Sequence, residues 1–490
     1  MQYLSTRDSA LRVSAQEAIV RGLAPQSGLF VPETFPQADL DAWKNLSYPE
    51  LAEKVLAGFL TDYSADFLHT ATASTYGAAF GGKAGETVRV RDGLYSLELW
   101  HGPTCAFKDY ALQLMPKLLV EAKKMLGRTE TTRILVATSG DTGKAALAGY
   151  ADLDGIEIEV FYPNDGTSEI QHLQMATQKG ENVQVYAVQG NFDDAQTGVK
   201  KVFADADVAA ELEKRGIRLS SANSINWGRV LPQIVYYISA YCDLLKSGAI
   251  QAGQQVNVCV PTGNFGNILA GYYARKMGVP IKTLLCASNA NNVLTDFLHT
   301  GVYDRNRAFY NTMSPSMDIL ISSNLERMLF EMTGGDDAAV RDYMGRLNTA
   351  GRYQVSDEVK EKLDGVFASG CCDDRETAQV IGEVWKEKGY LIDPHTAVAA
   401  NVMEQYRKAT GDKTVTVFVS TASPYKFCDH VLRAIGETPA GDGVELLDQL
   451  HETTGTAIPR RLAALKGKAR RFDLTCEKPG MDSVVLEFLK

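Results

Sequence analysis

The sequence predicts an α/β protein that contains two open, twisted, mainly parallel sheets flanked by helices. Three observations lead to this fold class. Short β-rich runs alternate with helical patterns from residue 95 onward, the runs are nearly continuous in apolar residues, and glycine-rich turns follow two of them. Strands that are buried on both faces of a parallel sheet show this continuous apolar pattern, because helices cover both sides. We predict strands at 134–138, 156–162, 183–188, 256–261, 281–287 and 415–420.

The two sheets divide the chain into domains, and we expect the active site in the cleft between them. A chain of 490 residues is long enough for roughly two to four domains. We expect an N-terminal region at 1–95, a larger domain made of 96–135 and 245–430, a smaller mobile α/β domain at 136–244, and a charged, helical tail at 431–490. A polar, helical insertion is expected in the larger domain at about 300–380.

Composition and charge indicate a soluble, cytoplasmic globular protein. Hydrophobic residues make up 45% and charged residues 22%, and the net charge of −10 argues against a surface for nucleic acid or for an anionic membrane. The eight cysteines form no CxxC pair and the seven histidines no HExxH, so we predict a reduced compartment and no metal site. Arg7, Asp8 and Arg12 interrupt the start of the chain, which therefore does not resemble a signal peptide.

The segment HGPTCAFKD at 101–109 contains the strongest candidate for a catalytic residue. Lys108 lies among small and apolar neighbours, directly before a helical pattern. A desolvated lysine amine is nucleophilic and can also carry protons, which suits imine chemistry with an aldehyde. We expect Asp109 to be the N-cap of a helix that Pro116 kinks or ends. The alternative is an exposed lysine in the first turn of a helix, although its flanking residues leave little polar surface nearby.

Two glycine-rich turns between a strand and a helix are candidate anion sites. The turn TGNFGN at 262–267 presents backbone N–H groups at a helix N-terminus, and its glycines let a phosphate approach closely. The turn SGDTG at 139–143 is of the same kind. It is not a P-loop, because Thr138 stands where the first glycine belongs and Ala145 where Ser or Thr would bind Mg²⁺. The turn at 262–267, taken alone, is equally compatible with an ordinary α/β connection.

Together these motifs resemble those of threonine synthases, which belong to the tryptophan-synthase-β-like group (fold type II) of pyridoxal-phosphate enzymes. The segment 101–109 is similar to the HGPTxAFKD signature of that family. Further similar segments extend in the expected order from residue 3 to about 425. They are YLSTR at 3–7 with the loop at 22–32, SGDTG at 139–143, SANSINWGR at 221–229, PTGNFGN at 261–267, NANNVL at 289–294 and STA at 420–422.

The resemblance implies pyridoxal 5'-phosphate as cofactor, bound mainly by the larger domain. Lys108 would form the Schiff base and shuttle protons, and Thr421 would donate its hydroxyl to the pyridine nitrogen. Thr421 taken alone could equally be a strand-end cap. The residues implied for the cofactor phosphate are Gly263, Asn264, Phe265, Gly266 and Asn267.

The resemblance also implies a substrate and a reaction. The enzyme would convert O-phospho-L-homoserine and water to L-threonine and phosphate by β,γ-elimination and replacement, the last step of threonine biosynthesis. A phospholyase that releases 2-oxobutyrate, or a non-catalytic homologue, are the alternatives. We expect a monomer or homodimer. The residues implied for the substrate are Ser139, Gly140, Asp141 and Thr142 at its carboxylate, and Asn223, Ser224 and Arg229 at its phosphate.

Asp141 departs from the pattern of many fold-type-II relatives, which have Asn at this position in contact with the ring oxygen of the cofactor. A carboxylate beside that oxygen would be repelled if nothing screened its charge. We therefore expect that Asp141 turns away, is protonated, or is neutralised by a cation such as Lys144.

Overall fold

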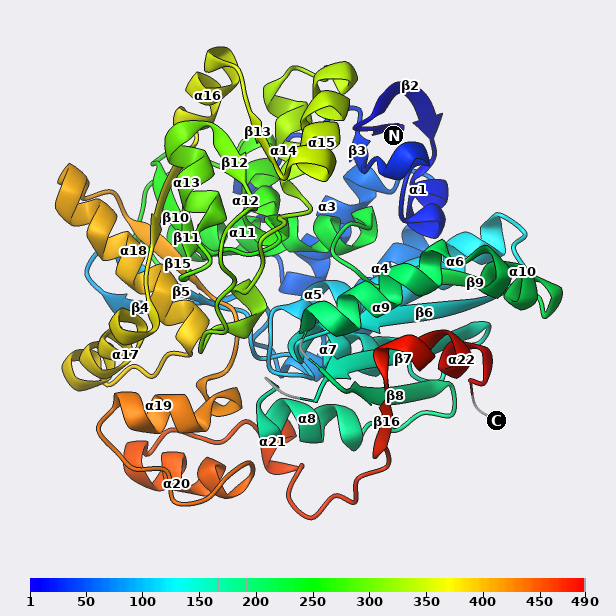
Figure 1. Ribbon diagram of the computed structural model, residues 1–490. Coiled ribbons are helices and arrows are strands. Elements are labelled where there is room, and N and C mark those ends of the chain that lie inside the picture. Colours follow the sequence, from blue (N-terminus) through cyan, green and yellow to red (C-terminus); the bar gives the residue numbers. More distant parts are fainter. Residues whose placement is uncertain (165–166, 191, 489–490) are drawn as a thin grey trace.

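The computed structural model describes residues 1–164, 167–190 and 192–488, and two sheets form the core of its two halves (Figure 1). The larger sheet has six strands, which are parallel except for the antiparallel strand at one edge. In spatial order they are β14 (Phe367–Cys371), β11 (Ile281–Ser288), β10 (Val256–Pro261), β15 (Thr416–Ser420), β5 (Leu94–Glu98) and β4 (Glu86–Arg91).

The smaller sheet has five strands and is parallel throughout. Its order is β16 (Leu474–Cys476), β8 (Val183–Val188), β7 (Ile156–Pro163), β6 (Thr131–Ala137) and β9 (Ile217–Ser221). The two parallel sheets with their helices confirm the predicted α/β class.

The carboxyl ends of β10 and β15 create the edge at which ligands bind in such sheets. The two strands are neighbours, with Val258 opposite Val417 and Cys259 opposite Phe418. Every residue of both strands is buried, as expected of central parallel strands. The turn after β10 and the residue after β15 therefore leave the sheet side by side.

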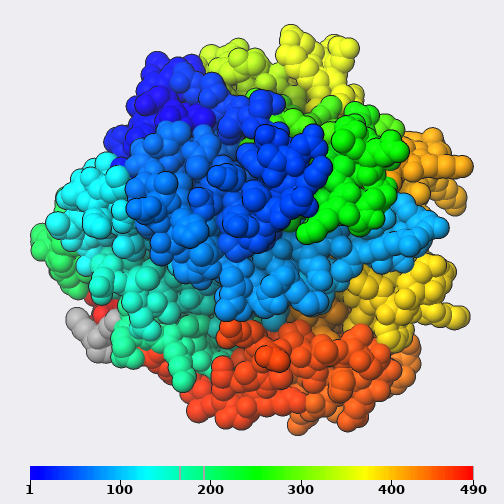
Figure 2. All heavy atoms as spheres, turned by 180° about the vertical axis from the view of Figure 1, so that it is seen from behind, coloured from blue at the N-terminus to red at the C-terminus, as the bar shows by residue number. Residues whose placement is uncertain are grey.

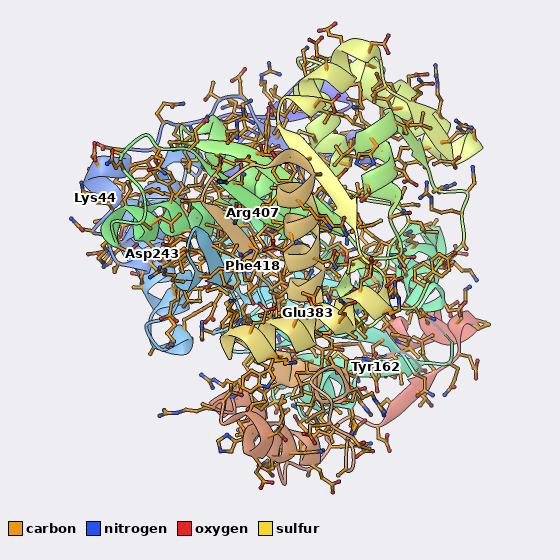
Figure 3. The ribbon with its side chains drawn as sticks, turned by 90° about the vertical axis from the view of Figure 1, so that its left-hand side faces the viewer. Lys44, Tyr162, Asp243, Glu383, Arg407 and Phe418 are labelled. Carbon is orange, nitrogen blue, oxygen red and sulfur yellow. The ribbon has the colours of Figure 1, made fainter. Side chains whose placement is uncertain are left out.

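Helices cover both sheets. On the larger sheet, α18 (Pro394–Thr410) contacts β10, β11, β14 and β15, and Figure 3 shows Arg407 of this helix beside Phe418 of β15. The other helices of this half are α11 (Trp227–Lys246), α12 (Gly266–Lys276), α13 (Val293–Thr300), α14 (Leu325–Met332), α15 (Asp337–Ala350), α16 (Asp357–Asp364), α17 (Asp374–Lys388) and α19 (Cys428–Ala434). Around the smaller sheet lie α7 (Asp141–Tyr150), α8 (Glu169–Ala176), α9 (Phe192–Ala204) and α10 (Ala206–Lys214).

The N-terminal residues pack across the back of the molecule, where they cover much of one face (Figure 2). They form a three-stranded antiparallel sheet and four helices, which reach α11 and the helices that follow β5. These elements are β1 (Tyr3–Ser5), β2 (Asp8–Val13), β3 (Phe30–Pro32), α1 (Ala15–Arg21), α2 (Leu40–Trp43), α3 (Tyr48–Phe59) and α4 (Ala65–Tyr76), followed after β5 by α5 (Lys108–Leu112) and α6 (Met115–Met125).

Five strands of the two main sheets lie where the sequence pattern predicted none, and they are β4, β5, β9, β14 and β16. β14 falls inside the stretch expected as an insertion, where β12 (Val302–Asp304) and β13 (Arg352–Gln354) form a separate pair. β9 is an edge strand without a fully buried residue. β16 belongs to the tail, which also contains α20 (Glu445–Thr454), α21 (Arg460–Ala463) and α22 (Met481–Leu486). Short edge strands bury little apolar surface, so their sequences lack the continuous apolar run.

Two observations concern the environment of the chain. Of the helices in the described residues, none combines the length and apolar composition that crossing a membrane requires. All eight cysteines are free thiols.

Candidate active site

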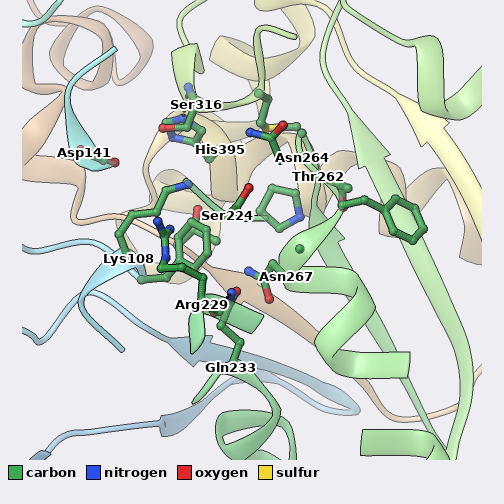
Figure 4. A pocket seen from close by; sticks show the side chains of 17 residues that line it. Lys108, Asp141, Ser224, Arg229, Gln233, Thr262, Asn264, Asn267, Ser316 and His395 are labelled. Atoms are coloured by element: carbon green, nitrogen blue, oxygen red, sulfur yellow. Dashed lines mark hydrogen bonds between the residues drawn. The ribbon is translucent and has the colours of Figure 1, made fainter. Parts of the chain in front are cut away.

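Lys108 is the first residue of α5 and lies against the carboxyl end of β15. The backbone N–H of Phe107 donates to the carbonyl of Thr421 at 2.8 Å, and Ala106 bridges to Ala422. The half-buried Lys108 side chain lines a cavity (Figure 4). Burial and the nearby charge of Arg229 lower the pKa of Lys108 to about 8. The alternative of an exposed surface lysine is thereby excluded.

Asp109 has a different role from the predicted N-cap. It lies inside the first turn of α5, where Oδ1 and Oδ2 accept hydrogen bonds from the hydroxyl and the N–H of Thr104, both at 2.8 Å. A Cβ at Gly102 would lie 2.5 Å from Oδ2 of Asp109, so only glycine fits there. The side chain therefore ties the loop 101–107 to the helix. As expected, the helix ends before Pro116, which lies in the first turn of α6.

The turn between β10 and α12 forms one wall of the same cavity. Phe265 has a φ of 61°, in the left-handed region, and aims the N-terminus of α12 at the cavity. A Cβ at Gly263 would meet the carbonyl oxygen of Ser316 at 3.0 Å. The backbone of this turn therefore approaches the segment around Ser316 as closely as its atoms allow.

Asn267 offers an unused donor to this cavity. The hydroxyls of Tyr236 and Tyr237 both donate to its Oδ1, each at 2.6 Å, and so fix the orientation of the amide. Its Nδ2 is buried and has no hydrogen-bond partner among the described residues. A buried donor without a partner is costly, so it marks a position where a ligand acceptor would be stabilising.

Thr421 and His395 line the cavity from the side of β15 and α18. His395 accepts a hydrogen bond at Nε2 from the N–H of Ser316 at 3.2 Å, and its Nδ1 donates to Asp393 at 2.7 Å. This dyad is buried and attaches the segment around Ser316 to α18. His395 therefore positions the part of the chain that packs over Gly263.

A second cavity shares Lys108, Ser224, Arg229, Asn264 and Ser316 with the first. Ser139, Thr142 and the exposed Asn223 line this outer cavity. Gly140 lines neither cavity, and its N–H donates to the hydroxyl of Thr138 at 2.9 Å. The outer cavity thus joins the turn 139–143 to the segment 223–229.

Asp141 is neutralised by Lys426 and not by Lys144. Its Oδ1 lies 2.6 Å from Nζ of Lys426 and accepts from Nε2 of Gln171 at 2.8 Å. The exposures of the two charged side chains are 4% and 0%. Burial alone would raise the pKa of Asp141, but the charge of Lys426 and the hydrogen bonds from Lys426 and Gln171 outweigh it and the pKa is lowered. Lys144 donates instead to Gln178.

Arg229 is a buried cation between the two cavities. Its Nη1 donates to the carbonyl of Ala222, while its Nε is buried and finds no partner in the described part of the chain. Burial lowers its pKa to about 10, which still leaves the guanidinium charged at neutral pH. Arg229 and Ser224 therefore present a charge and a hydroxyl where an anion could bind.

Comparison with known proteins identifies the family. A family model described as "Pyridoxal-phosphate dependent enzyme" matches residues 87–355. Models described as "Threonine synthase N terminus" and "Threonine synthase, C-terminal" match residues 2–76 and 396–481. This chain belongs to the threonine synthase family. Pyridoxal 5'-phosphate is the cofactor of these enzymes, and the resemblance noted in the sequence is confirmed.

The family assignment extends over nearly the whole chain. A threonine synthase from Pseudomonas aeruginosa is 38% identical over 473 residues, which is 95% of this chain and 97% of that protein. The human protein "Threonine synthase-like 1" is 41% identical over 88% of this chain, but the chain spans only 60% of its length. Crystal structures of threonine synthases from Brucella melitensis, with pyridoxal phosphate bound, and from yeast each superpose with a TM-score of 0.88, at 35% and 33% identity. They cover the whole of this chain, and 99% and 98% of their own.

The first cavity described above, lined by Lys108, Thr421 and the turn 262–267, is called the inner cavity from here on, and its residues fit this cofactor. They combine a lysine with a lowered pKa, a glycine-rich turn at a helix N-terminus and the unpartnered Nδ2 of Asn267. An amine that is partly uncharged can react with an aldehyde, and the turn can bind a phosphate.

Sequence reasoning missed several residues of the site. His395, Ser316 and Gln233 line the inner cavity, and Lys426 holds Asp141. Asp393 is the N-cap of α18, and Pro394 lies in the first turn of this helix. Asp followed by Pro is a helix start signal that can be recognised in the sequence, and it could have drawn attention to His395, the next residue.

Proposed function

We propose that this chain is a threonine synthase, which converts O-phospho-L-homoserine and water to L-threonine and phosphate. The observation that carries the proposal is Arg229, a buried cation with a free Nε donor, in the wall shared by the lysine cavity and the outer cavity. A substrate with a phosphate at its far end needs such a cation within reach of the reacting lysine.

In this proposal the inner cavity holds the cofactor. Lys108 carries its aldehyde carbon, and Thr421 gives its hydroxyl to the ring nitrogen. The phosphate lies at the N-terminus of α12, where the positive end of the helix and the N–H groups of the turn stabilise it. The residues that hold the phosphate are Gly263, Asn264, Phe265, Gly266 and Asn267.

The outer cavity holds the substrate. Ser139 and Thr142 bind its carboxylate with the N–H groups in the first turn of α7. Asp141 contributes its backbone and not its side chain, because Lys426 and Gln171 occupy the carboxylate.

Arg229, Ser224 and Asn223 bind the substrate phosphate. The bound cofactor supplies an electron sink that makes the Cα proton of the substrate acidic. The Lys108 amine takes this proton and then a proton from Cβ, so that the phosphate can leave Cγ, and it returns protons to Cγ and Cα, since a pKa of about 8 lets it exist in both forms. Arg229 stabilises the charge of the phosphate as it leaves Cγ. One water adds at Cβ, which balances the reaction.

We further propose that the enzyme works in the cytoplasm as a monomer or homodimer with a small-molecule substrate. The eight free cysteines support a reducing compartment.

The test is a product analysis. The protein, loaded with pyridoxal phosphate, is incubated with O-phospho-L-homoserine, and threonine, 2-oxobutyrate and phosphate are measured. We expect equal amounts of threonine and phosphate. Phosphate together with 2-oxobutyrate and ammonia would identify a phospholyase. A protein that binds the cofactor but releases no phosphate would contradict both reactions.

A further inference from the structure

Lys200 borders the outer cavity from α9, an element to which the sequence reasoning gave no role in binding. Gln196 and Lys200 line this cavity together with Arg229, which comes from α11. α9 belongs to the smaller sheet's half of the molecule, whereas α11 packs against α12 and α3. The two basic side chains therefore reach the same cavity from different elements.

The packing of α9 directs Lys200 toward the cavity. Ala195, Val199 and Val202 are buried in the cluster that covers the smaller sheet, so they fix one face of the helix. Gln196 and Lys200 lie one turn apart on another face. Nζ of Lys200 donates to Oε1 of Gln196 at 3.2 Å, which holds the exposed end of the lysine beside the cavity.

The outer cavity has an excess of positive charge. Apart from Lys108, which binds the cofactor in the proposed function, its basic lining residues are Lys200 and Arg229, while Asp318 is the only carboxylate among its lining residues in the described part of the chain. The Asp318 carboxylate already accepts hydrogen bonds from Asn289, Asn291 and Thr312. An anion that enters this cavity therefore meets more positive charge than the carboxylate can offset.

We propose that Lys200 is a second ligand of the substrate phosphate and sets the preference for phosphorylated over unphosphorylated amino acids. This inference rests on the proposed function. A phosphate monoester carries a charge of about −1.5 to −2 at pH 7, so one guanidinium balances only part of it. Lys200 supplies the remaining charge from α9. When Lys200 and Arg229 both bind the phosphate, the phosphate links α9 to α11.

The experiment compares Lys200→Gln with Lys201→Gln in the protein loaded with pyridoxal phosphate. Lys201 is the adjacent exposed lysine of α9 and lines neither cavity, so its substitution removes the same charge from the same helix. Three quantities are measured: the KM and kcat for O-phospho-L-homoserine, the inhibition constant of inorganic phosphate, and the affinity for L-threonine from the cofactor absorbance.

We expect Lys200→Gln to raise the KM and the phosphate inhibition constant about tenfold, the range of one charge-assisted hydrogen bond. The affinity for L-threonine, which has no phosphate, should stay unchanged, and Lys200→Arg should restore most of the loss. Equal values for Lys200→Gln and Lys201→Gln would overturn the inference.

A separate measurement distinguishes this inference from the proposed function. If the protein does not consume O-phospho-L-homoserine, calorimetric binding of inorganic phosphate to the loaded protein still tests Lys200. Phosphate binding that only Lys200→Gln weakens would support the inference without the reaction. Phosphate binding that neither variant changes, or no phosphate binding at all, would reject it.

Discussion

Lys426 is the residue whose removal should destabilise the protein most clearly. Lys426→Met leaves the ionised Asp141 buried with only Gln171 as a partner, and it also removes the 3.0 Å hydrogen bond from Nζ to the carbonyl of Thr104. Breaking a buried ion pair by removing one partner costs about 3–5 kcal/mol. Because both side chains are almost completely buried, we expect a loss of about 4 kcal/mol of unfolding free energy, within that range.

The double variant Asp141→Asn with Lys426→Met is the matched control. It removes both charges, and the amide oxygen introduced at this position can still accept a hydrogen bond from Gln171, so the double variant should recover most of the stability. Urea denaturation of Lys426→Met, of Asp141→Asn and of the double variant at pH 7.5, followed by tryptophan fluorescence, gives the three differences in free energy from the unmodified protein. Additive losses, or a single Lys426→Met loss below about 1 kcal/mol, would refute the reasoning, since that is the size of an exposed pair.

Three further predictions concern pH and the cofactor. The folded pKa of Asp141 lies below its unfolded value near 3.8, so the Asp141–Lys426 pair contributes its stability above pH 3.8. The urea midpoint should therefore fall as the pH is lowered through 3.8 toward the folded pKa, and it should fall by less in the double variant. The rate at which cofactor-free protein takes up pyridoxal phosphate should rise with pH around 8, as Lys108 loses its proton; a rate independent of pH between 6 and 9 would contradict this. Gly263→Ala should weaken cofactor binding about tenfold in an absorbance titration, because the new Cβ would press on the carbonyl oxygen of Ser316. The control variant Gly345→Ala, at a helical glycine with open space around it, should leave cofactor binding unchanged.

The strands and turns that build the site could be predicted from the sequence because their signals are local. β10 and β15 are continuous apolar runs, and each is buried on both faces. The glycines of 263–266 follow β10 directly, so the anion turn was expected where it lies. Edge strands such as β9 and β16 could not be found this way, since their pairing depends on the neighbouring strand and not on their own apolar content.

The partner of Asp141 shows why contacts across the fold escape local reasoning. Lys144 is three residues away on α7, so helical spacing makes it the expected cation. Lys426 comes from the segment after β15 and reaches Asp141 only because the two halves of the molecule meet there. His395 was missed for the same reason, because Ser316 reaches it only through the packing of α18, although its contact with Asp393 is local.

The central claim, that Lys108 carries the cofactor, is tested most directly by chemical trapping. The protein loaded with pyridoxal phosphate is reduced with borohydride, digested, and mapped by mass spectrometry. We expect the reduced pyridoxyl group on Lys108, and no stable label on the Lys108→Ala variant. A label on any other lysine of the unmodified protein, or no label at all, would contradict the account.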